Sequence, residues 1–309
     1  MGRIPAGGHP QITMFRETLA ALQRGKPGDI LHYVADTGPL VQTRRPSVVT
    51  VHGVASRWID TARTPSQDAV WRTRVRRAID ATERIITVSH SSADDVQNVF
   101  DVSPDRITTI YHGIDVEKFS ARTELSDELA TRLPLKFALY LGNIEPRKNL
   151  VELVRAFDRP ELKAMGVPLV IAGKPAWNSE DSMRAISRSE NVHHLGFVSD
   201  LDRVALMQAC AVFVFPSLYE GFGFPVLEAL SAGAVVTTSR RGSLAEVSGP
   251  ALELQDLSAE GIASGVIDAL TNTKARSDCR VSGLSWASQF TWDESVDKHV
   301  EVYKSLAAA

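Results

Sequence analysis

Two glutamates, Glu220 and Glu228, lie on either side of a glycine-containing turn. The apolar run Val212–Phe215 precedes the turn and is typical of a buried parallel strand, and Pro225 begins a helix that continues to Leu230. A strand, a glycine turn and a helix N-terminus together present backbone N–H groups to an anion, usually a phosphate. Carboxylates repel phosphate, so the two glutamates are better suited to accept hydrogen bonds from sugar hydroxyls. The segment therefore predicts a site for a phosphate and a polyol together, as in a nucleotide sugar.

A second group of residues that could bind phosphate follows the apolar run 137–141. Gly142 and Asn143 open a turn that carries Arg147 and Lys148, and a helix is predicted over residues 150–157. Cations at a helix N-terminus oppose the helix dipole and cost stability. That cost is understandable if a diphosphate docks there and is neutralised by both side chains, with help from backbone amides. The alternative is that both cations point into water.

Strands and helices alternate along the whole chain. The predicted strands are Asp29–Val34, Ser47–Val51, Arg84–Val88 and Arg106–Tyr111, followed by Phe137–Leu141, Leu169–Ala172, Val192–Leu195, Val212–Phe215 and Val235–Thr238. Such alternation favours an α/β fold with parallel sheets, whose ligands gather at the carboxyl edge of the strands. With 309 residues and 44% hydrophobic content, the chain is long enough for two such domains.

The sequence resembles the retaining glycosyltransferases of family 4, which have the GT-B fold. The resemblance rests on the E-x7-E spacing of Glu220 and Glu228 within PSLYEGFGFPVLEALSAG, on GNIEPRKN at 142–149 and on TVHG at 50–53. It extends over residues 29–306 and is most specific between 137 and 249. It implies two Rossmann-like domains that face a cleft, and the N-terminal one is shortened here because no convincing strand precedes Asp29.

The resemblance also implies how the chain is divided. Residues 1–122 correspond to the acceptor-side domain and residues 123–290 to the nucleotide-sugar domain. The segment HGIDVEKF at 112–119 resembles the entry to the interdomain linker. Residues 291–309 are expected to form a helix that crosses back to the first domain.

The same resemblance implies roles for individual residues. Glu220 is expected to hold the donor-sugar hydroxyls and Glu228 the ribose hydroxyls. Lys148 and Arg147 are expected to stabilise the departing diphosphate, and His52 to face the donor sugar. Further donor contacts are implied for Gly221, Phe222, Gly223, Gly142, Asn143, Val198, Ser243 and Leu244.

The chain departs from the family pattern at three positions. Many members carry Arg directly after the glycine, where this chain has Asn143, so Arg147 is expected to substitute for it. An Asp often follows the family histidine, where this chain has Gly53, and a lone histidine after a strand is otherwise commonly structural. Ala245 replaces a proline in the segment expected to close over the donor, and the alternative is a plain loop.

The predicted activity is transfer of a sugar from a nucleoside diphosphate to a hydroxyl of a glycan or lipid-linked glycan. No side chain stands out as a covalent nucleophile, so catalysis is expected from positioning and from stabilisation of the diphosphate charge. Two alternatives stay open. One is a nucleotide-sugar epimerase or phosphorylase of the same broad fold, and the other is a non-catalytic nucleotide-sugar-binding module.

Two other ligand classes are disfavoured. Residues 221–223 begin a G-x-G-x-x-G dinucleotide pattern, but Val226 occupies the third glycine position. The D-x-D pair Asp200 and Asp202 resembles a metal-binding motif of the other main glycosyltransferase fold, yet it is better explained as the capped start of a helix over 201–209. We therefore expect no cofactor besides the donor substrate and no metal requirement.

Composition restricts the partners and the location. The net charge of −3 and a pI near 6.3 do not indicate the basic surface that nucleic-acid binding requires. Two cysteines, Cys210 and Cys279, suit a reducing compartment, and no signal-peptide or membrane-spanning run is present in the sequence. The expected location is the cytoplasm, including the inner face of the membrane.

Four arginines crowd the helix predicted over 70–81, namely Arg72, Arg74, Arg76 and Arg77. They form either a solvated basic face or a contact with anionic lipid. Because the first domain keeps only four predicted strands, a sheet edge is expected to need cover. We therefore expect a second copy, a partner protein or the membrane surface to complete the acceptor side.

Overall fold

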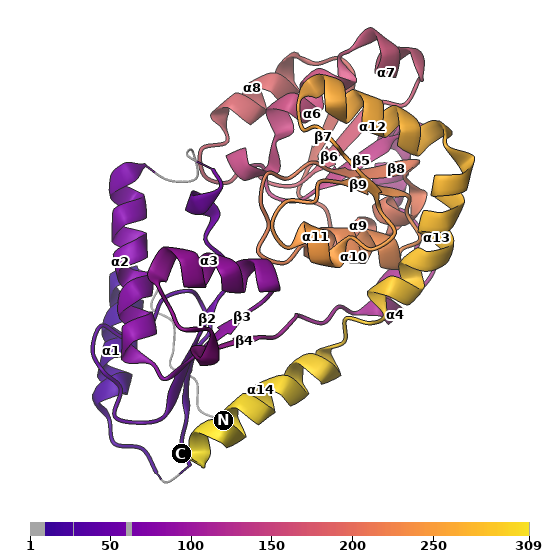
Figure 1. The fold of residues 1–309 in the computed structure, drawn as a ribbon. Coiled ribbons are helices and arrows are strands. Elements are labelled where there is room, and N and C mark those ends of the chain that lie inside the picture. The colour runs from indigo at the N-terminus through magenta and orange to yellow at the C-terminus, as the bar shows by residue number, and fades with distance from the viewer. Residues whose placement is uncertain (1–9, 27, 60–63, 309) are drawn as a thin grey trace. The chain divides into compact units, whose positions relative to one another are not determined.

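The computed structural model describes residues 10–26, 28–59 and 64–308. The chain divides into two compact units: unit 1 comprises Met1–Gly113 with Trp292–Ala309, and unit 2 comprises Ile114–Thr291 (Figure 1). The sequence placed this division near residue 122. The last helix, expected to cross back to the first domain, is part of unit 1.

Unit 1 is built on a parallel sheet with the strand order β1-β2-β3-β4. The strands correspond to the four predicted from the sequence, and each pairs with the next along the chain. In this register Val49 lies opposite Ile85. The bounds are β1 (Leu31–Tyr33), β2 (Ser47–Val51), β3 (Arg84–Thr87) and β4 (Ile107–Thr109).

Side chains alternate along a strand, so each face of this sheet carries its own set of apolar side chains. Helices cover both faces. The helices of unit 1 are α1 (Pro10–Leu22), α2 (Pro65–Ala81), α3 (His90–Phe100) and α14 (Trp292–Ala307), with short 3-10 turns η1 (Ala55–Arg57) and η2 (Pro104–Arg106). Val49 and Ile85 pack in one apolar cluster with α2 and α3. Val48 and Ile86 pack in a second cluster with α14. The C-terminal helix therefore supplies part of the core of unit 1.

Two helices of unit 1 begin where side-chain caps dictate. Helix α2 starts earlier than the predicted Val70, because Thr64 and Gln67 form a reciprocal capping box. Helix α3 is capped by Ser89, whose hydroxyl accepts the backbone N–H of Ser92, and not by one of the two serines that follow His90. The caps move the helix starts without changing the fold.

Unit 2 contains a larger parallel sheet with the order β10-β9-β8-β5-β6-β7. Every residue of β5, β6 and β8 is buried, which explains their unbroken apolar sequences. The short edge strand β10 was not predicted. The bounds are β5 (Ala138–Leu141), β6 (Leu169–Ala172), β7 (Val192–Gly196), β8 (Val212–Phe215), β9 (Val236–Thr238) and β10 (Leu252–Glu253).

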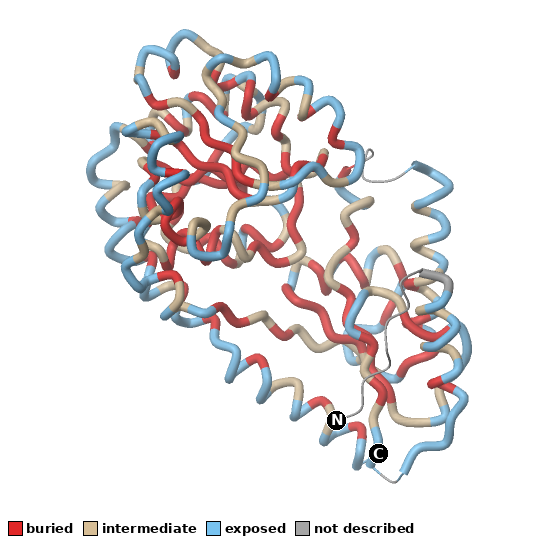
Figure 2. Tube along the Cα trace, turned by 180° about the vertical axis from the view of Figure 1, so that it is seen from behind, coloured by how far each residue is buried: buried red, intermediate tan, exposed pale blue. Residues whose placement is uncertain are grey.

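Helices cover both faces of this sheet as well. Helices α6, α8 and α12 lie together on one face, and α9 and α10 lie on the other (Figure 1). Figure 2 shows buried residues concentrated on the strands of each unit. The bounds are α4 (Val116–Ser120), α5 (Asp127–Arg132), η3 (Pro146–Lys148), α6 (Leu150–Phe157), α7 (Pro160–Ala164), α8 (Glu180–Arg188), α9 (Asp200–Ala209), α10 (Phe224–Ser231), α11 (Leu244–Val247), α12 (Ala259–Thr271) and α13 (Thr273–Ala287).

Candidate functional site

Two loops of unit 2 meet at the carboxyl edge of its sheet. One loop follows β5 and carries Arg147 and Lys148, and the other follows β8 and carries Glu220. Strands β5 and β8 are far apart in the sequence but are hydrogen-bonded neighbours. Since parallel neighbours end at the same edge, the sheet order brings the predicted phosphate loop against the predicted sugar loop.

Glu220 forms ion pairs with both predicted cations. Its Oε2 lies 2.5 Å from Nη1 of Arg147, and its Oε1 lies 2.5 Å from Nζ of Lys148. The Nε of Arg147 also lies 2.6 Å from Oε1 of Glu145, a residue to which the sequence had assigned no role. Lys148, Glu220 and Glu145 are each no more than 6% exposed. Two cations and two carboxylates thus form an almost buried group that carries no net charge.

Burial and mutual attraction set the charge states of this group. Burial raises the pKa of Glu220, but Lys148 and Arg147 outweigh it, so the pKa lies below its ordinary value. Burial lowers the pKa of Arg147, but the two carboxylates outweigh it and the pKa is raised. For Lys148 burial dominates over Glu220, and the pKa is lowered. An incoming diphosphate would favour the charged form of this lysine.

The segment that precedes α11 contacts the turn after Glu220 and stabilises it. The Ser243 hydroxyl lies 2.9 Å from the carbonyl oxygen of Glu220 and 2.6 Å from that of Phe222. At Gly242, with φ of 59°, an added Cβ would lie 2.6 Å from the Glu220 carbonyl oxygen. Ser243 and Leu244 are fully buried, and their backbone N–H groups donate to the carbonyl oxygens of Glu220 and Arg241, so both residues support the turn.

The turn itself is formed by Gly221, Phe222 and Gly223. Phe222 is buried, with its ring 5.0 Å from that of Phe224 and 6.1 Å from that of Phe290. Gly223 adopts φ of 109°, a left-handed conformation that favours glycine. An added Cβ there would also lie 2.9 Å from Cδ2 of Leu244. Because two of these residues are glycines and the Phe222 side chain is buried, the turn presents mainly backbone atoms to the site.

Gly142 and Asn143 lie where β5 and β6 end together. Gly142 has φ of 153°, and its carbonyl oxygen would be only 1.9 Å from a Cβ added at Gly173. The hydroxyl of Tyr140 donates to the carbonyl oxygen of Asn143 at 2.9 Å, while the Asn143 residue is exposed. The two glycines therefore let adjacent loops approach closely, and Asn143 presents its side chain to solvent.

Glu228 lies on α10 and is 7% exposed. Its Oε1 forms an ion pair with Arg203 of α9, a residue that the sequence analysis did not single out. Burial raises the pKa of Glu228 and outweighs the attraction of Arg203. Nothing in the local sequence of α9 indicated this contact, because only the packing of α9 beside α10 creates it.

The D-x-D pair binds protein groups. Asp200 forms an ion pair with Lys118 at 2.9 Å, and Asp202 accepts the backbone N–H of Ser126 at 3.0 Å. Ser199 caps α9 by accepting the N–H of Asp202. Among the described residues, no group of three or more His, Cys, Asp or Glu side chains could hold a metal ion.

Val198, the expected base contact, follows the edge strand β7 and is half-buried. Beside it lies a pair that the sequence analysis missed. Phe197 is 72% exposed, and Nζ of Lys174 lies 4.3 Å from the centre of its ring. Lys174 follows the end of β6 and Phe197 follows the end of β7, so both lie at the carboxyl edge of the sheet. This position after a strand could have indicated the pair from the sequence.

His52 belongs to unit 1, whereas all other predicted site residues belong to unit 2. Its backbone N–H donates to Oδ1 of Asp36 at 2.6 Å, and its Nε2 lies 2.9 Å from the carbonyl oxygen of Val34. The ring stacks on that of His112, with centroids 5.7 Å apart. Its position at the carboxyl edge of β2 agrees with the prediction from the sequence.

Three of the four arginines on α2 have partners within unit 1. Arg77 is exposed. The partners are Asp68 and Ser56 for Arg72, Thr37 for Arg74 and the carbonyl oxygen of Phe100 for Arg76. Much of the predicted basic face is therefore used in holding α2 to its neighbours.

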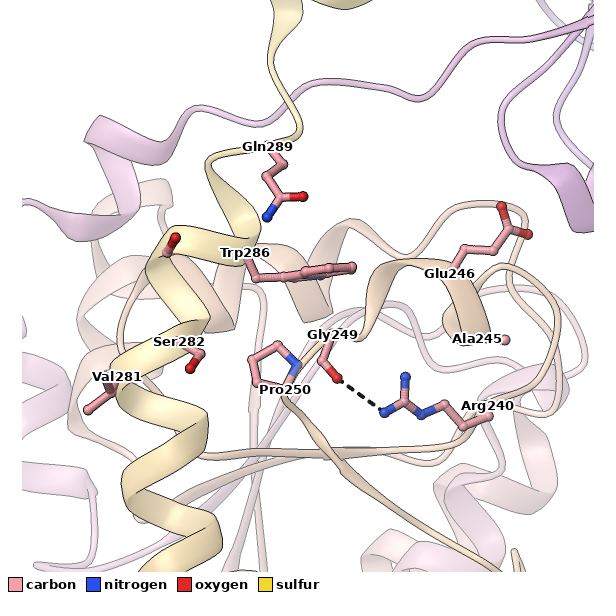
Figure 3. Close-up of a pocket in the computed structure, with 10 residues that line it drawn as sticks. Arg240, Ala245, Glu246, Gly249, Pro250, Val281, Ser282, Trp286 and Gln289 are labelled. Atoms are coloured by element: carbon pink, nitrogen blue, oxygen red, sulfur yellow. Dashed lines mark hydrogen bonds between the residues drawn. The ribbon is translucent and has the colours of Figure 1, made fainter.

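A separate cavity of about 570 Å³ lies in unit 2 between the segment after β9 and the end of α13 (Figure 3). Arg240, Glu246, Trp286 and Gln289 help to line it. Nε1 of Trp286 donates to the carbonyl oxygen of Val247 at 2.8 Å, which fixes the indole ring. None of the predicted site residues lines this cavity, so the chemistry of the charged group, and not this hollow, identifies the candidate site.

Comparison with known families agrees with this geometry. The sequence profile described as Glycosyl transferases group 1 matches residues 121–286, and the profile described as Glycosyltransferase Family 4 matches residues 3–118. The chain belongs to this glycosyltransferase family. The two profiles meet between residues 118 and 121, close to the predicted boundary, whereas the compact units divide after Gly113.

Several curated relatives of this chain are mannosyltransferases. O-antigen chain mannosyltransferase B of Escherichia coli is 30% identical over 240 residues, which cover 75% of this chain and 63% of that protein. The GDP-mannose:cellobiosyl-diphosphopolyprenol alpha-mannosyltransferase of Xanthomonas campestris is 28% identical over 88% of this chain and 70% of its own length. The chain spans less than two thirds of the first of these relatives, and 29% of the Escherichia coli mannosyltransferase WbdA.

Solved structures show the same GT-B fold. The sucrose-phosphate synthase of Thermosynechococcus elongatus matches with a TM-score of 0.75 at 19% identity, over 99% of this chain and 83% of that one. The Anabaena protein HepE, crystallised with UDP and glucose, matches with a TM-score of 0.68 at 20% identity, over 85% and 72% of the two chains. The predicted fold class, two Rossmann-like units, is confirmed.

Proposed function

We propose that this protein is a retaining glycosyltransferase that moves a sugar from a nucleoside diphosphate to a hydroxyl of a glycan or lipid-linked glycan. The observation that carries the proposal is the buried group of Arg147, Lys148 and Glu220 beside the turn 221–223. Two fixed cations suit a diphosphate, and a carboxylate at the same sheet edge suits sugar hydroxyls. Membership of the family supports the same activity.

The donor that we propose is GDP-mannose. The support comes from the relatives, among which are an O-antigen mannosyltransferase and an enzyme named for GDP-mannose and a diphosphopolyprenol-linked acceptor. The proposed acceptor class, a glycan or lipid-linked glycan, has the same support. Val198 is proposed as a contact of the nucleobase and Glu228 as the residue that binds the ribose.

In the proposed reaction the bond from the anomeric carbon to the β-phosphate oxygen breaks, and the acceptor oxygen bonds to the same face of that carbon. The acceptor proton passes to the departing diphosphate. Lys148 and Arg147 would neutralise the charge that develops on this leaving group. Glu220 would exchange part of its pairing with them for hydrogen bonds to the donor sugar. The two cations take the role that a metal ion has in other transferases, so the proposed reaction is metal-independent.

The remaining predicted residues have supporting roles in the proposal. Backbone N–H groups of the turn 221–223 and of Asn143 would bind phosphate oxygens. The N–H of Gly142 donates to the carbonyl oxygen of Ala172, so Gly142 would contribute by letting this loop approach the donor closely. Ser243 and Leu244 would act on the donor by supporting the turn 221–223. His52 remains our proposed donor-sugar residue on unit 1.

The experiment that tests this function is a thermal-shift panel of GDP-mannose, UDP-glucose, ADP-glucose and dTDP-glucose, followed by a nucleotide-release assay. A ligand that binds the native state raises the melting temperature by mass action. We expect the largest rise with GDP-mannose, and acceptor-dependent release of GDP. An epimerase would convert the donor without an acceptor, a phosphorylase would need orthophosphate, and a binding module would show the shift without turnover. Absence of any shift across the panel would refute the proposed site.

The acceptor side is proposed to be completed by a membrane surface, a second copy or a partner protein. Helix α1 exposes large apolar side chains at helical spacing on one face, namely Ile12, Phe15, Leu19 and Leu22. In the part of the chain that the structure describes, no helix is both long and apolar enough to cross a membrane. Liposome flotation with anionic lipid, beside sedimentation, tests the proposal. A monomer that ignores liposomes and has full transfer activity would refute it.

A further inference from the structure

Glu228, the proposed ribose-binding residue, has one carboxylate oxygen in an ion pair and one without a hydrogen-bond partner in the described part of the chain. Oε1 of Glu228, on α10, is paired with Arg203, on α9. Oε2 is buried and has no hydrogen-bond partner among the described residues. A buried carboxylate oxygen is costly unless a donor reaches it. Oε2 is therefore the carboxylate oxygen of Glu228 that still lacks a hydrogen-bond donor from the chain as the structure describes it.

Arg203 is itself held in place by the segment that begins unit 2. Its guanidinium carbon lies 5.2 Å from the centre of the Phe119 ring, on α4. Nε2 of Gln208, on α9, donates to the carbonyl oxygens of Phe119 and Ala121 at 2.9 and 2.8 Å. Helix α4 also packs directly against α10. These contacts hold α9, the helix that carries Arg203, against the segment 119–121.

Few other charges act on Glu228. Helix α9 contributes Asp200 besides Arg203, and α4 contributes Lys118, whose ammonium is paired with Asp200 and partly exposed. Helix α13 packs against α10, and its buried titratable group is the Cys279 thiol. Burial raises the pKa of that thiol, so it stays neutral. Arg203 is thus the main cation that offsets the burial of Glu228, and Lys118 is a smaller one.

We propose that Arg203 is a positioning residue for the nucleotide ribose: it holds the Glu228 carboxylate ionised and oriented, so that Oε2 accepts hydrogen bonds from ribose hydroxyls. The inference rests on the proposed function, in which Glu228 binds the ribose. The diphosphate is held by a different set of charges, Arg147, Lys148 and Glu220. Loss of Arg203 should therefore impair recognition of the ribose hydroxyls and leave recognition of the phosphates intact.

The test is calorimetric binding of GDP and of 2′-deoxy-GDP to the wild type and to Arg203→Met, between pH 6 and pH 9. The wild type is expected to prefer GDP. At pH 7 the variant should bind GDP about tenfold or more weakly and lose this preference, because an uncompensated buried Glu228 takes up a proton. As the pH rises through the raised pKa of Glu228, the preference for GDP should return, while binding of 2′-deoxy-GDP changes little.

Two further variants separate positioning from a structural role. Arg203→Lys keeps a cation and should retain much of the ribose preference, which keeps the proposal testable if Arg203→Met does not fold. In a Glu228→Gln background, Arg203→Met should add no pH-dependent loss, because no carboxylate is left to titrate. Arg155→Met is the matched control, because that arginine is exposed and pairs with Glu152 on the same helix, α6.

Two results would overturn the inference. One is unchanged preference for GDP in Arg203→Met at every pH, and the other is equal loss of GDP and 2′-deoxy-GDP without recovery at high pH. Either result would leave the proposed function standing as long as the wild type binds GDP. A wild type that binds neither GDP nor UDP would refute the proposed function itself, and this inference with it.

Discussion

Replacing Lys148 by methionine is the most direct test of the charged group. The ammonium of Lys148 lies 2.5 Å from Oε1 of Glu220 and 4.7 Å from the centre of the Phe215 ring, and the residue is 5% exposed. Methionine keeps most of the apolar stem and removes the charge. The substitution leaves Glu220 paired with Arg147 alone, in a group that then carries a net negative charge.

Two separate losses are expected from Lys148→Met. Breaking a buried ion pair costs about 3–5 kcal/mol of unfolding free energy, and we expect the lower end because Arg147 still compensates Glu220. Losing a fixed cation at the developing diphosphate charge costs about 3 kcal/mol of transition-state stabilisation, or roughly a 100-fold fall in kcat/KM. The first loss is read from urea unfolding and the second from donor turnover.

A double variant separates the two losses. Lys148→Met together with Glu220→Gln removes both members of the pair, so the unfolding free energy should largely return while turnover stays low. Arg155→Met is the control, and because its ion pair with Glu152 is exposed, it should cost less than about 1 kcal/mol. Unchanged kcat/KM in Lys148→Met, or turnover that returns with stability in the double variant, would refute the phosphate assignment.

Three more predictions concern the donor, metal ions and pH. Glu228→Ala should raise the KM for the donor and Glu220→Ala should chiefly lower kcat, since hydrogen bonds to charged acceptors contribute roughly 1.5–3 kcal/mol; wild-type kinetics in both would contradict the assignment. Turnover should survive EDTA, and inhibition that is reversed only by added magnesium or manganese would revive the D-x-D hypothesis. Burial lowers the pKa of His32 and of His112 to about 4, below the unfolded value of 6.5. The unfolded state then binds more protons, so stability is complete above pH 6.5 and falls towards pH 4, by about 3 kcal/mol for His32. His32→Gln should reduce the slope of the urea-midpoint profile across this window and leave the contribution of His112, and an unchanged profile would contradict the cause.

Features that depend on neighbouring residues in the chain could be predicted from the sequence. All nine predicted strands are present, and the clearest of them, such as 212–215, are apolar throughout and end at glycine or proline. The placement of Glu220 before the turn and of Glu228 within the helix also followed from local spacing. Helix starts were less predictable, since Thr64 and Ser89 compete with several nearby polar residues for the cap position.

Contacts between distant segments were decided only by the tertiary structure. The pairing of Glu220 with Arg147 and Lys148 exists because β5 and β8 are neighbours in the sheet, and the sequence does not state that order. The Arg203 contact with Glu228 needs α9 packed beside α10. Burial then sets the charge states, because desolvation depends on all the chain that surrounds a group and not on the residues beside it. The sequence by itself therefore determined which residues could do the chemistry, and the fold decided which of them meet and how strongly each holds its proton.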